Sequence, residues 1–448
     1  MVASAFDLFR IGPGPSSMHV MGPHRAANRF VQEIATDGIL AKVHRVEVEL
    51  FGGLAFTGRD LGTDRAIIAG LTGLLPDRCD HATLARYADR IETEQLLKLA
   101  NGPSINFAAL RDLRFVVDRA VAYDGNAMRF VVSDRYGAVL ASRVYFSTGH
   151  GRIVGENDRP AAATIRLPYR FVSADALLEG CSSRRMRVAD FARANECIRR
   201  SPDEVRVGLL EVAMVMRVAL QRGLTTEGVL PSGNRRTAPS WSAAIREIAA
   251  AEAGHEVLAE RAALYATAVA EEKAAGGRVV SAPSSGSAGP VAALLQLWFD
   301  SAPLKHDDGV VDFLLVSTTI GGMLRAAGVA HVGCQSEVGV AAAMAAAGFA
   351  SALGASDTQI VYAADMALRP HLGLTCDPTA GRIEDPCIER NAVAASRACV
   401  AALAAVRTPS PRNGIDATIR AMVASGQTMA SRHKSKSLAG VAVNLAEC

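Results

Sequence analysis

Three cysteines in the C-terminal half of the chain have the residue type and setting of metal ligands. Cys376 and Cys387 lie eleven positions apart in the segment GLTCDPTAGRIEDPCIERNAV, and Cys334 lies forty-two positions before Cys376 in HVGCQSEVGV. The longer segment is dense in aspartate, glycine and proline, which predicts an irregular loop that can aim both of its thiols at one point. The last residue, Cys448, is a fourth thiol. Thiolates are soft ligands that suit zinc or an iron–sulfur cluster.

The spacing of these cysteines matches no C-x-x-C zinc ribbon or redox pair, so ordinary core cysteines remain the plain alternative. Eight cysteines in 448 residues are too few for a disulfide framework. We expect the other four, Cys79, Cys181, Cys197 and Cys399, to be small core residues. If three thiols instead held a four-iron cluster, one iron would stay open, and an open metal centre supports Lewis-acid catalysis.

A second group of polar residues lies near the N-terminus. The segment IGPGPSSMHVMGPHRAANRF places Ser16, Ser17 and His19 just before a helix predicted from about Pro23. Serines at a helix start can cap the free backbone N–H groups, and the same N–H groups can bind a carboxylate, so both readings stay open. In TGRDLGTDR, Thr63 and Asp64 open the next apolar helix, where Asp64 is expected to be an N-cap.

The hydrophobic pattern predicts two regions. Over residues 1–155, alternation predicts a strand from Val43 to Leu50 and a hairpin from MRFVVSDRYG and AVLASRVYFSTGHG, mixed with helices, which indicates an α+β domain. Residues 156–172 lose this period and contain two prolines, as linkers do. Residues 173–448 carry long helix-period segments rich in Ala, Leu, Glu and Arg, which predict an all-α catalytic domain.

Composition excludes several classes of function. The chain has 48 basic and 45 acidic residues, so its net charge of +3 provides no basic field for nucleic acid. The apolar run from Val338 to Ala355 has nearly membrane-spanning length, but it is mostly alanine and glycine, which favours a buried, closely packed helix. The loop SAPSSGSAGP lacks the lysine of a phosphate-binding loop. No signal-peptide pattern opens the chain, so we expect cytoplasmic residence.

Four motifs spread over the chain form one signature: GPSSMHVMGP, SAPSSGSAG, GCQSEVGVAAAMAAAG and LGLTCDPTAGRIEDPCIERNAV. Together they resemble the bacterial iron–sulfur L-serine dehydratases, of the single-chain type in which a smaller β domain precedes a helical α domain. The resemblance implies a [4Fe–4S] cluster bound by Cys334, Cys376 and Cys387, with Cys448 folding back as a fourth ligand that substrate displaces. It also implies a homodimer that acts on a small-molecule amino acid, with no pyridoxal phosphate and no nucleic-acid or membrane partner.

The reaction implied by this resemblance is β-elimination. An open iron would coordinate the β-hydroxyl of the substrate, a base would remove the α-proton, and the resulting aminoacrylate would hydrolyse to a 2-oxo acid and ammonia. The resemblance suggests His19 as the base or acid, because the pKa of a histidine ordinarily lies near working pH. The residues that would hydrogen-bond the carboxylate and amine of the substrate are Ser16, Ser17, Thr63 and Asn126, the last in GNAMRF.

The chain departs from the family pattern at several active-site positions. The family's SSSHT is SSMHV here, with Met18 in place of the third serine. Its GKGHGTD is GRDLGTD, which puts Leu61 where the family has a histidine and keeps Thr63 and Asp64. Its APTNGAAG is APSSGSAG, with Ser285 at the asparagine position. Leucine cannot move a proton, so another group must do so.

The replacement of the family's GGGF by GHGR introduces His150. Either His19 or His150 has therefore taken over proton transfer, or the reaction differs. Three functions stay open: a lyase for L-serine, the same type of lyase for another β-hydroxy or β-substituted amino acid in specialised metabolism, and a non-catalytic cluster-binding paralogue. Retention of all the cysteines speaks against the third.

Overall fold

The computed structural model describes residues 3–117, 126–158, 167–251, 255–301, 307–329, 332–379, 382 and 384–434. The chain folds into two compact units. The sheet unit contains Ile11–Thr164 and Ala275–Arg278, and the helical unit contains Met1–Arg10, Ile165–Ala274 and Val279–Cys448. Two short strands, β1 (Arg10–Pro13) and β9 (Arg278–Ser281), lie where the chain passes from one unit to the other. An N-terminal region with a sheet followed by a helical region confirms the predicted fold class.

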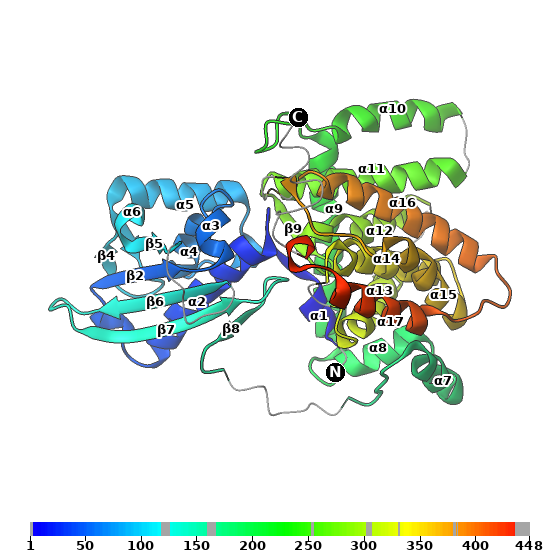
Figure 1. Cartoon of the computed structure of the whole chain (residues 1–448), viewed down its shortest axis with the longest axis horizontal. Helices are drawn as coiled ribbons and strands as arrows, with labels where there is room; N and C mark the ends of the chain where they lie inside the picture. Colours follow the sequence, from blue (N-terminus) through cyan, green and yellow to red (C-terminus); the bar gives the residue numbers. More distant parts are fainter. Residues whose placement is uncertain are drawn as a thin grey trace. The chain divides into compact units, whose positions relative to one another are not determined.

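The sheet unit is built on a five-stranded sheet with the strand order β5-β2-β6-β7-β8 (Figure 1). Its strands are β2 (Arg45–Leu50), β5 (Leu113–Phe115), β6 (Ala127–Ser133), β7 (Val139–Ser147) and β8 (Ile153–Gly155). Neighbouring strands run antiparallel except β2 and β5, which run parallel. The predicted strand is thus β2, and the predicted hairpin is the β6–β7 pair.

Helix α2 packs against strands β6, β7 and β8 of the sheet. The helices of this unit are α2 (Gly22–Thr36), α3 (Gly53–Thr57), α4 (Thr63–Leu71), α5 (His81–Glu94) and α6 (Ala109–Asp112), and a small hairpin joins β3 (Leu96–Lys98) to β4 (Ser104–Asn106). Phe30 of α2 stacks on Phe130 of β6 with ring centroids 5.1 Å apart. Burial alternates along β2, as expected for a strand with one face in the core.

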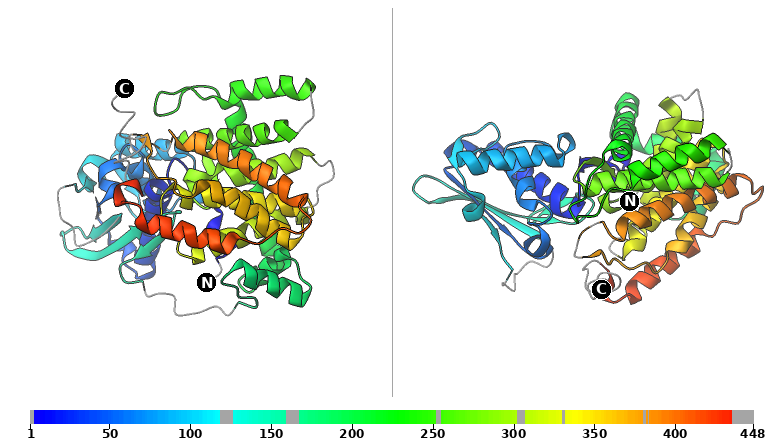
Figure 2. Two further views of the ribbon diagram at one scale, coloured as in Figure 1. Left: turned by 45° about the vertical axis from the view of Figure 1, so that its right-hand side comes forward. Right: turned by 90° about the horizontal axis from the view of Figure 1, so that it is seen from above.

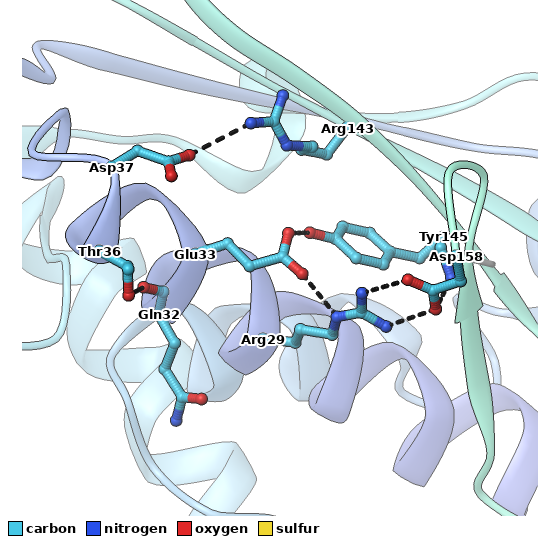
Figure 3. Close-up of polar contacts among 9 residues, drawn as sticks. Arg29, Gln32, Glu33, Thr36, Asp37, Arg143, Tyr145 and Asp158 are labelled. Carbon is cyan, nitrogen blue, oxygen red and sulfur yellow. Dashed lines mark hydrogen bonds and ion pairs between the residues drawn. The ribbon is translucent and has the colours of Figure 1, made fainter. Parts of the chain in front are cut away.

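A network of ion pairs fastens α2 to the far edge of the sheet (Figure 3). Arg29 donates from Nη1 and Nη2 to the two carboxylate oxygens of Asp158, at 2.7 and 2.5 Å, and from Nε to Glu33 at 2.6 Å. The hydroxyl of Tyr145, on β7, donates to the other oxygen of Glu33 at 2.6 Å. The hydrogen bond from Arg29 lowers the pKa of Asp158 to about 2. The network therefore joins α2, β7 and the turn that follows β8.

The helical unit packs around α14 (Figures 1 and 2). Its helices are α1 (Ala5–Leu8), α7 (Ala174–Arg184), α8 (Val188–Glu196), α9 (Pro202–Thr225), α10 (Ala238–Ala251), α11 (His255–Ala274), α12 (Gly289–Ser301), α13 (Asp307–Ala326), α14 (Val338–Ala352), α15 (Asp357–Leu368), α16 (Cys387–Val406) and α17 (Ile415–Thr428). Helix α14 contacts α12, α13, α15 and α16, and the orange α16 runs along the green α11. The small side chains of α14 allow this close approach, so the prediction of a buried helix is confirmed.

One helix among the described residues, α13, has the length and apolar composition to cross a membrane. Of its most apolar window, 78% is buried inside the protein, as for a core helix. Length and composition alone are weak grounds for a membrane span.

Candidate active site

The three internal cysteines are carried on three different kinds of backbone. Cys334 opens a single 3-10 turn, Cys334–Ser336, just before α14. Cys376 lies on an irregular segment, as predicted, but Cys387 is the first residue of α16 and does not belong to the loop. Pro386 is the N-cap of α16, a position where its missing N–H costs no helical hydrogen bond. The free N–H groups of that first turn favour negative charge on a nearby thiolate.

The three thiols interact with one another. Burial raises the pKa of Cys334 to about 11, and burial together with the charge of Cys334 raises the pKa of Cys387 to about 12. The pKa of Cys376 is raised further, by burial, by Glu337 and by both other cysteines. The charges of neighbouring thiols thus raise the pKa of Cys376 and Cys387. The thiols stay protonated at neutral pH unless a metal ion displaces their protons.

The potential metal donors of this site are thiols with carboxylates beside them, and thiolates are soft ligands. Among the described residues, no three His, Cys, Asp or Glu side chains are placed to hold one metal ion. Glu384, 5% exposed, also has a buried Oε2 with no hydrogen-bond partner in the described part of the chain. Buried thiols and an unsatisfied carboxylate oxygen are what a polar group bound here would contact.

Two buried cations lie among these acidic groups. Arg390 donates from Nη1 to the carbonyl of Thr375 at 2.8 Å and pairs through Nη2 with Asp377 at 2.9 Å. Lys273, near the C-terminal end of α11, is 1% exposed. Burial lowers the pKa of Lys273 to about 8, a shift that the charges of Cys387 and of nearby carboxylates partly oppose. The site therefore holds compensating positive charge for thiolates.

The serine-rich loop before α12 closes over the same site. Ser284 donates to Oε2 of Glu337 at 2.9 Å, and its Oγ lies 3.1 Å from that of Ser287. Asn391, in the first turns of α16, donates to the carbonyl of Gly286 at 2.8 Å. All of these side chains except Glu337 are buried. The loop that the sequence singled out is thus held beside the cysteines by Glu337 and Asn391.

The segment after α17 also lies on the cysteine loops. The backbone N–H of Cys376 donates to the carbonyl of His433 at 2.8 Å. Gly333 has φ +84°, and a Cβ there would lie 2.5 Å from the carbonyl oxygen of Leu374 and 3.0 Å from the sulfur of Met429. Only glycine fits a position with that φ and those neighbours. Cys448 itself lies outside the described residues, fifteen positions after His433.

In the sheet unit, Ser16 and His19 form a hydrogen-bonded pair at the start of α2. Ser16 caps a π-helical turn, Ser17–Met21, by accepting from the backbone N–H of His19 at 3.3 Å, so the predicted cap is confirmed. The same oxygen lies 3.1 Å from the ring Nδ1 of His19. On the other side of the ring, Nε2 lies 3.1 Å from Oγ1 of Thr57, a hydroxyl that donates to the carbonyl of Gly53.

These contacts assign the proton of the neutral ring. Because the hydroxyl proton of Thr57 is used toward Gly53, Nε2–H donates and Nδ1 is left as the acceptor that faces Ser16. Burial lowers the pKa of His19 to about 4, although a hydrogen bond to the Gly53 carbonyl opposes this shift. The expectation of a pKa near working pH is therefore wrong. Histidine in water titrates near neutrality, but the charged ring loses its hydration in this site.

Thr63 and Asn126 surround the same turn. Thr63, 0% exposed, donates from Oγ1 to the carbonyl of His19 at 2.6 Å. Asn126 donates to the sulfur of Met18 at 2.7 Å, and Ser147 at the end of β7 donates to the carbonyl of Met18 at 2.8 Å. Hydrogen bonds to the turn Ser17–Met21 thus place Thr63 and Asn126 beside Ser16 and His19.

Asp64, Ser17 and His150 occupy the margin of this group. Asp64 lies in the first turn of α4 but does not cap it, because the N-cap is Gly62 in the left-handed region with φ +80°. Ser17 is buried in the π-helical turn. His150 lies in the turn between β7 and β8 with φ 51°. At the next residue, Gly151, an added Cβ would lie 3.3 Å from the side chain of Met21. The hairpin turn thus packs on the turn that carries His19.

Comparison with known proteins decides the family. The model of the serine dehydratase alpha chain matches residues 183–442, and that of the serine dehydratase beta chain matches residues 4–158. L-serine dehydratase of Streptomyces coelicolor is 39% identical over 100% of both chains, and L-serine dehydratase 2 of Escherichia coli is 37% identical over 99% of each. L-serine dehydratase of Mycobacterium tuberculosis is 39% identical over 100% of this chain and 99% of its own. The chain belongs to the serine dehydratase family.

The predicted resemblance is thereby confirmed, and the chain is an enzyme of the ammonia-lyase class. The non-catalytic paralogue is no longer a competing function. As a serine dehydratase, the chain carries Cys334, Cys376 and Cys387 within the alpha match and the Ser16–His19 pair within the beta match. Its polar groups thus fall into two sets, one in each unit.

Several polar residues of this serine dehydratase were not found from the sequence. They are Thr57, Ser147, Lys273, Glu337, Glu384, Arg390 and Asn391. Arg390 and Asn391 lie in the quoted motif PCIERNAV, so their nearness to Cys387 was a usable signal. Thr57 is the last residue of α3, four positions before Leu61. The backbone N–H of Leu61 donates to the carbonyl of Thr57 at 3.2 Å. Nothing in the helical pattern of α11 distinguishes Lys273, because only packing buries it.

Proposed function

We propose that this enzyme eliminates water from L-serine and releases pyruvate and ammonia, with a [4Fe–4S] cluster held by Cys334, Cys376 and Cys387. The single observation that carries the proposal is that hydrogen bonds join the three cysteine segments. Arg390, three residues after Cys387, donates to the carbonyl of Thr375, and Gln335, next to Cys334, hydrogen-bonds to Leu374 and Gly373. When bound, the cluster would supply Lewis-acid activation of the β-hydroxyl. The relatives named L-serine dehydratase support the choice of substrate.

The residues of the chain supply binding and proton handling. Neutral His19 keeps an open acceptor on Nδ1 toward the Ser16 hydroxyl, 3.1 Å away, so a proton that reaches Ser16 can pass to the ring. Thr57 fixes the ring from the Nε2 side, and Thr63 fixes the backbone of the turn. With a pKa of about 4, His19 binds a proton weakly, so it would pass the proton on quickly and not store it.

The remaining polar residues of the sheet unit would bind the amino acid. We assign hydrogen bonding of its carboxylate and amine to Ser16, Ser17, Thr63 and Asn126, with Asp64 and His150 at the margin. Asn126 donates one N–H to the sulfur of Met18, the residue that replaces the serine of the family. The second N–H of its amide and its carbonyl oxygen are then left for a ligand. The amide thus keeps one donor and one acceptor for an amino acid.

A second substrate class stays open because of Leu61, Met18 and Ser285. Leu61, Met18 and Ser285 stand where the family has a histidine, a serine and an asparagine. The alternative is therefore the same elimination on another β-hydroxy or β-substituted amino acid. Anaerobic reconstitution followed by a screen of β-substituted L-amino acids for ammonia release tests both. Turnover of serine alone supports the proposal, a better response to another amino acid supports the alternative, and no response to any contradicts both.

We also propose that Cys448 ligates the fourth iron in the resting enzyme. The support is the hydrogen bond of His433 to Cys376 and the nearness of Met429 to Gly333, which direct the chain before the tail onto the cysteine loops. An iron–thiolate bond would order a terminal segment, and terminal residues are ordered only when something ties them down. We also propose cytoplasmic residence, because an air-labile cluster suits a reducing compartment. A homodimer is proposed as well, and light scattering of the native enzyme tests it.

A further inference from the structure

Arg390 has contacts that relate it to all three cysteine segments. It lies three residues after Cys387, in the first turn of α16. Its Nη1 donates to the carbonyl of Thr375, and its Nη2 pairs with Asp377. The guanidinium therefore binds the residues on both sides of Cys376. The side chain of Arg390 is 17% exposed, and that of Asp377 is 3% exposed. These contacts therefore form away from bulk water, where charged hydrogen bonds are strong.

The third segment, that of Cys334, is reached through the loop that Arg390 holds. The Cys334 turn is joined to the loop before Cys376, because Gln335 donates from its backbone N–H to the carbonyl of Leu374 at 3.3 Å and accepts from Gly373 at 2.9 Å. Arg390 connects this pair of segments to α16, and thereby to Cys387.

The charge of the site gives Arg390 a second task. Three thiolates would add three negative charges to a site that already holds Glu337, Asp377 and Glu384. Buried negative charges repel one another, and cations placed among them offset this repulsion. The guanidinium stays charged at every working pH and offers donors in a rigid plane, which suits one cation that serves several acceptors. Hydrogen bonds to ligand sulfurs also tune the potential of an iron–sulfur centre.

We propose that Arg390 is the positioning residue of the cysteine site: it joins the segments of Cys334, Cys376 and Cys387 into one ligand set and compensates the charge of their thiolates. The second part of this inference rests on the proposed function, because it needs a bound cluster. The first part concerns the chain alone and can be measured without one.

The test compares Arg390→Met and Arg390→Lys with Arg397→Met, a change of an exposed arginine on the same helix. Each variant is reconstituted anaerobically, and we measure iron and sulfide per chain, the rate of cluster loss to a chelator and the midpoint potential. Arg390→Met should lose its cluster about 10- to 100-fold faster than wild type and have a lower potential. Arg390→Lys should restore part of the potential but not the retention, because one ammonium cannot reproduce the planar fork. Arg397→Met should match wild type.

A second measurement uses the protein without a cluster. Deuterium exchange of residues 373–379 should be faster in Arg390→Met than in Arg397→Met, at unchanged far-ultraviolet circular dichroism. Equal retention, potential and exchange in the two variants would overturn the inference. If wild type bound no iron or sulfide while exchange of this loop still rose in Arg390→Met, the proposed function would fail and the positioning role would stand. Should Arg390→Met not fold, Arg390→Lys carries both comparisons.

Discussion

The protonation of His19 sets how the rate of this enzyme should depend on pH. A free histidine has a pKa near 6.5, whereas burial lowers that of His19 to about 4. At pH 5.5 about 97% of the ring is therefore unprotonated, compared with about 9% for a histidine in water. If unprotonated His19 receives the α-proton through Ser16, kcat/KM for L-serine should change by less than about 1.1-fold on its account between pH 7.5 and 5.5. A base with an ordinary pKa would lose about tenfold.

The assay measures kcat/KM and exchange of the α-proton with deuterated solvent, from pH 5 to 8, on reconstituted enzyme. His19→Ala should lower both by about 100- to 10,000-fold, which is the usual contribution of a positioned proton acceptor, while iron and sulfide per chain stay at the wild-type value. His150→Ala is the matched control, since His150 lies in the neighbouring hairpin turn. A tenfold fall in wild-type kcat/KM that centres on pH 6.5 would refute the reasoning, and loss of exchange in His150→Ala instead would move the role to His150.

Acid sensitivity of the fold limits the range of that experiment. His24, 0% exposed, also has a pKa lowered to about 4, with burial as the main cause. Between pH 6.5 and 4 the unfolded chain binds a proton that the folded chain does not, so the free energy of unfolding falls as pH falls through this window. A shift of this size corresponds to about 3 kcal/mol for one buried group. Rates below pH 5 therefore have to be measured with a parallel unfolding control.

Three further predictions concern the cysteines, the tail and the sheet unit. Cys334→Ala, Cys376→Ala and Cys387→Ala should each abolish the broad brown absorption of the reconstituted cluster, whereas Cys399→Ala should not; bound zinc without iron or sulfide would contradict the cluster. Cys448→Ser should bind substrate at least as readily as wild type but lose its cluster faster in air, and a resting structure with an intact cluster and this sulfur more than about 4 Å from every iron would exclude the tail as a ligand. Arg29→Met should weaken protection of β7 amides by about 1 to 2 kcal/mol more than Arg90→Met, which removes an exposed pair. Deuterium exchange is the measurement, because both tryptophans, Trp241 and Trp298, lie in the helical unit. Because the pKa of Asp158 is lowered to about 2, this difference should be full above pH 4 and vanish as pH falls to 2.

Local pattern determined the elements of this protein and its ligand types. Alternation along β2 and the β6–β7 hairpin, and helical period in α9, follow from which side chains must be buried, so they could be read residue by residue. The sequence also singled out Cys334, Cys376 and Cys387 by residue type, although the loop predicted for Cys387 is the start of α16. Ser16 as a cap follows from the same local reasoning.

Tertiary packing decided what these residues can do. His19 looked like a group that titrates near neutrality, and only its burial between Ser16 and Thr57 shows a ring that stays neutral. Lys273 has no distinguishing neighbours along α11, yet it is buried beside Cys387. Arg390 of α16 contacts the loop on both sides of Cys376, and the N-cap of α4 is Gly62 and not the predicted Asp64. Burial and contacts between distant segments depend on the whole fold, because desolvation and charge pairing are set by neighbours in space and not by neighbours in sequence.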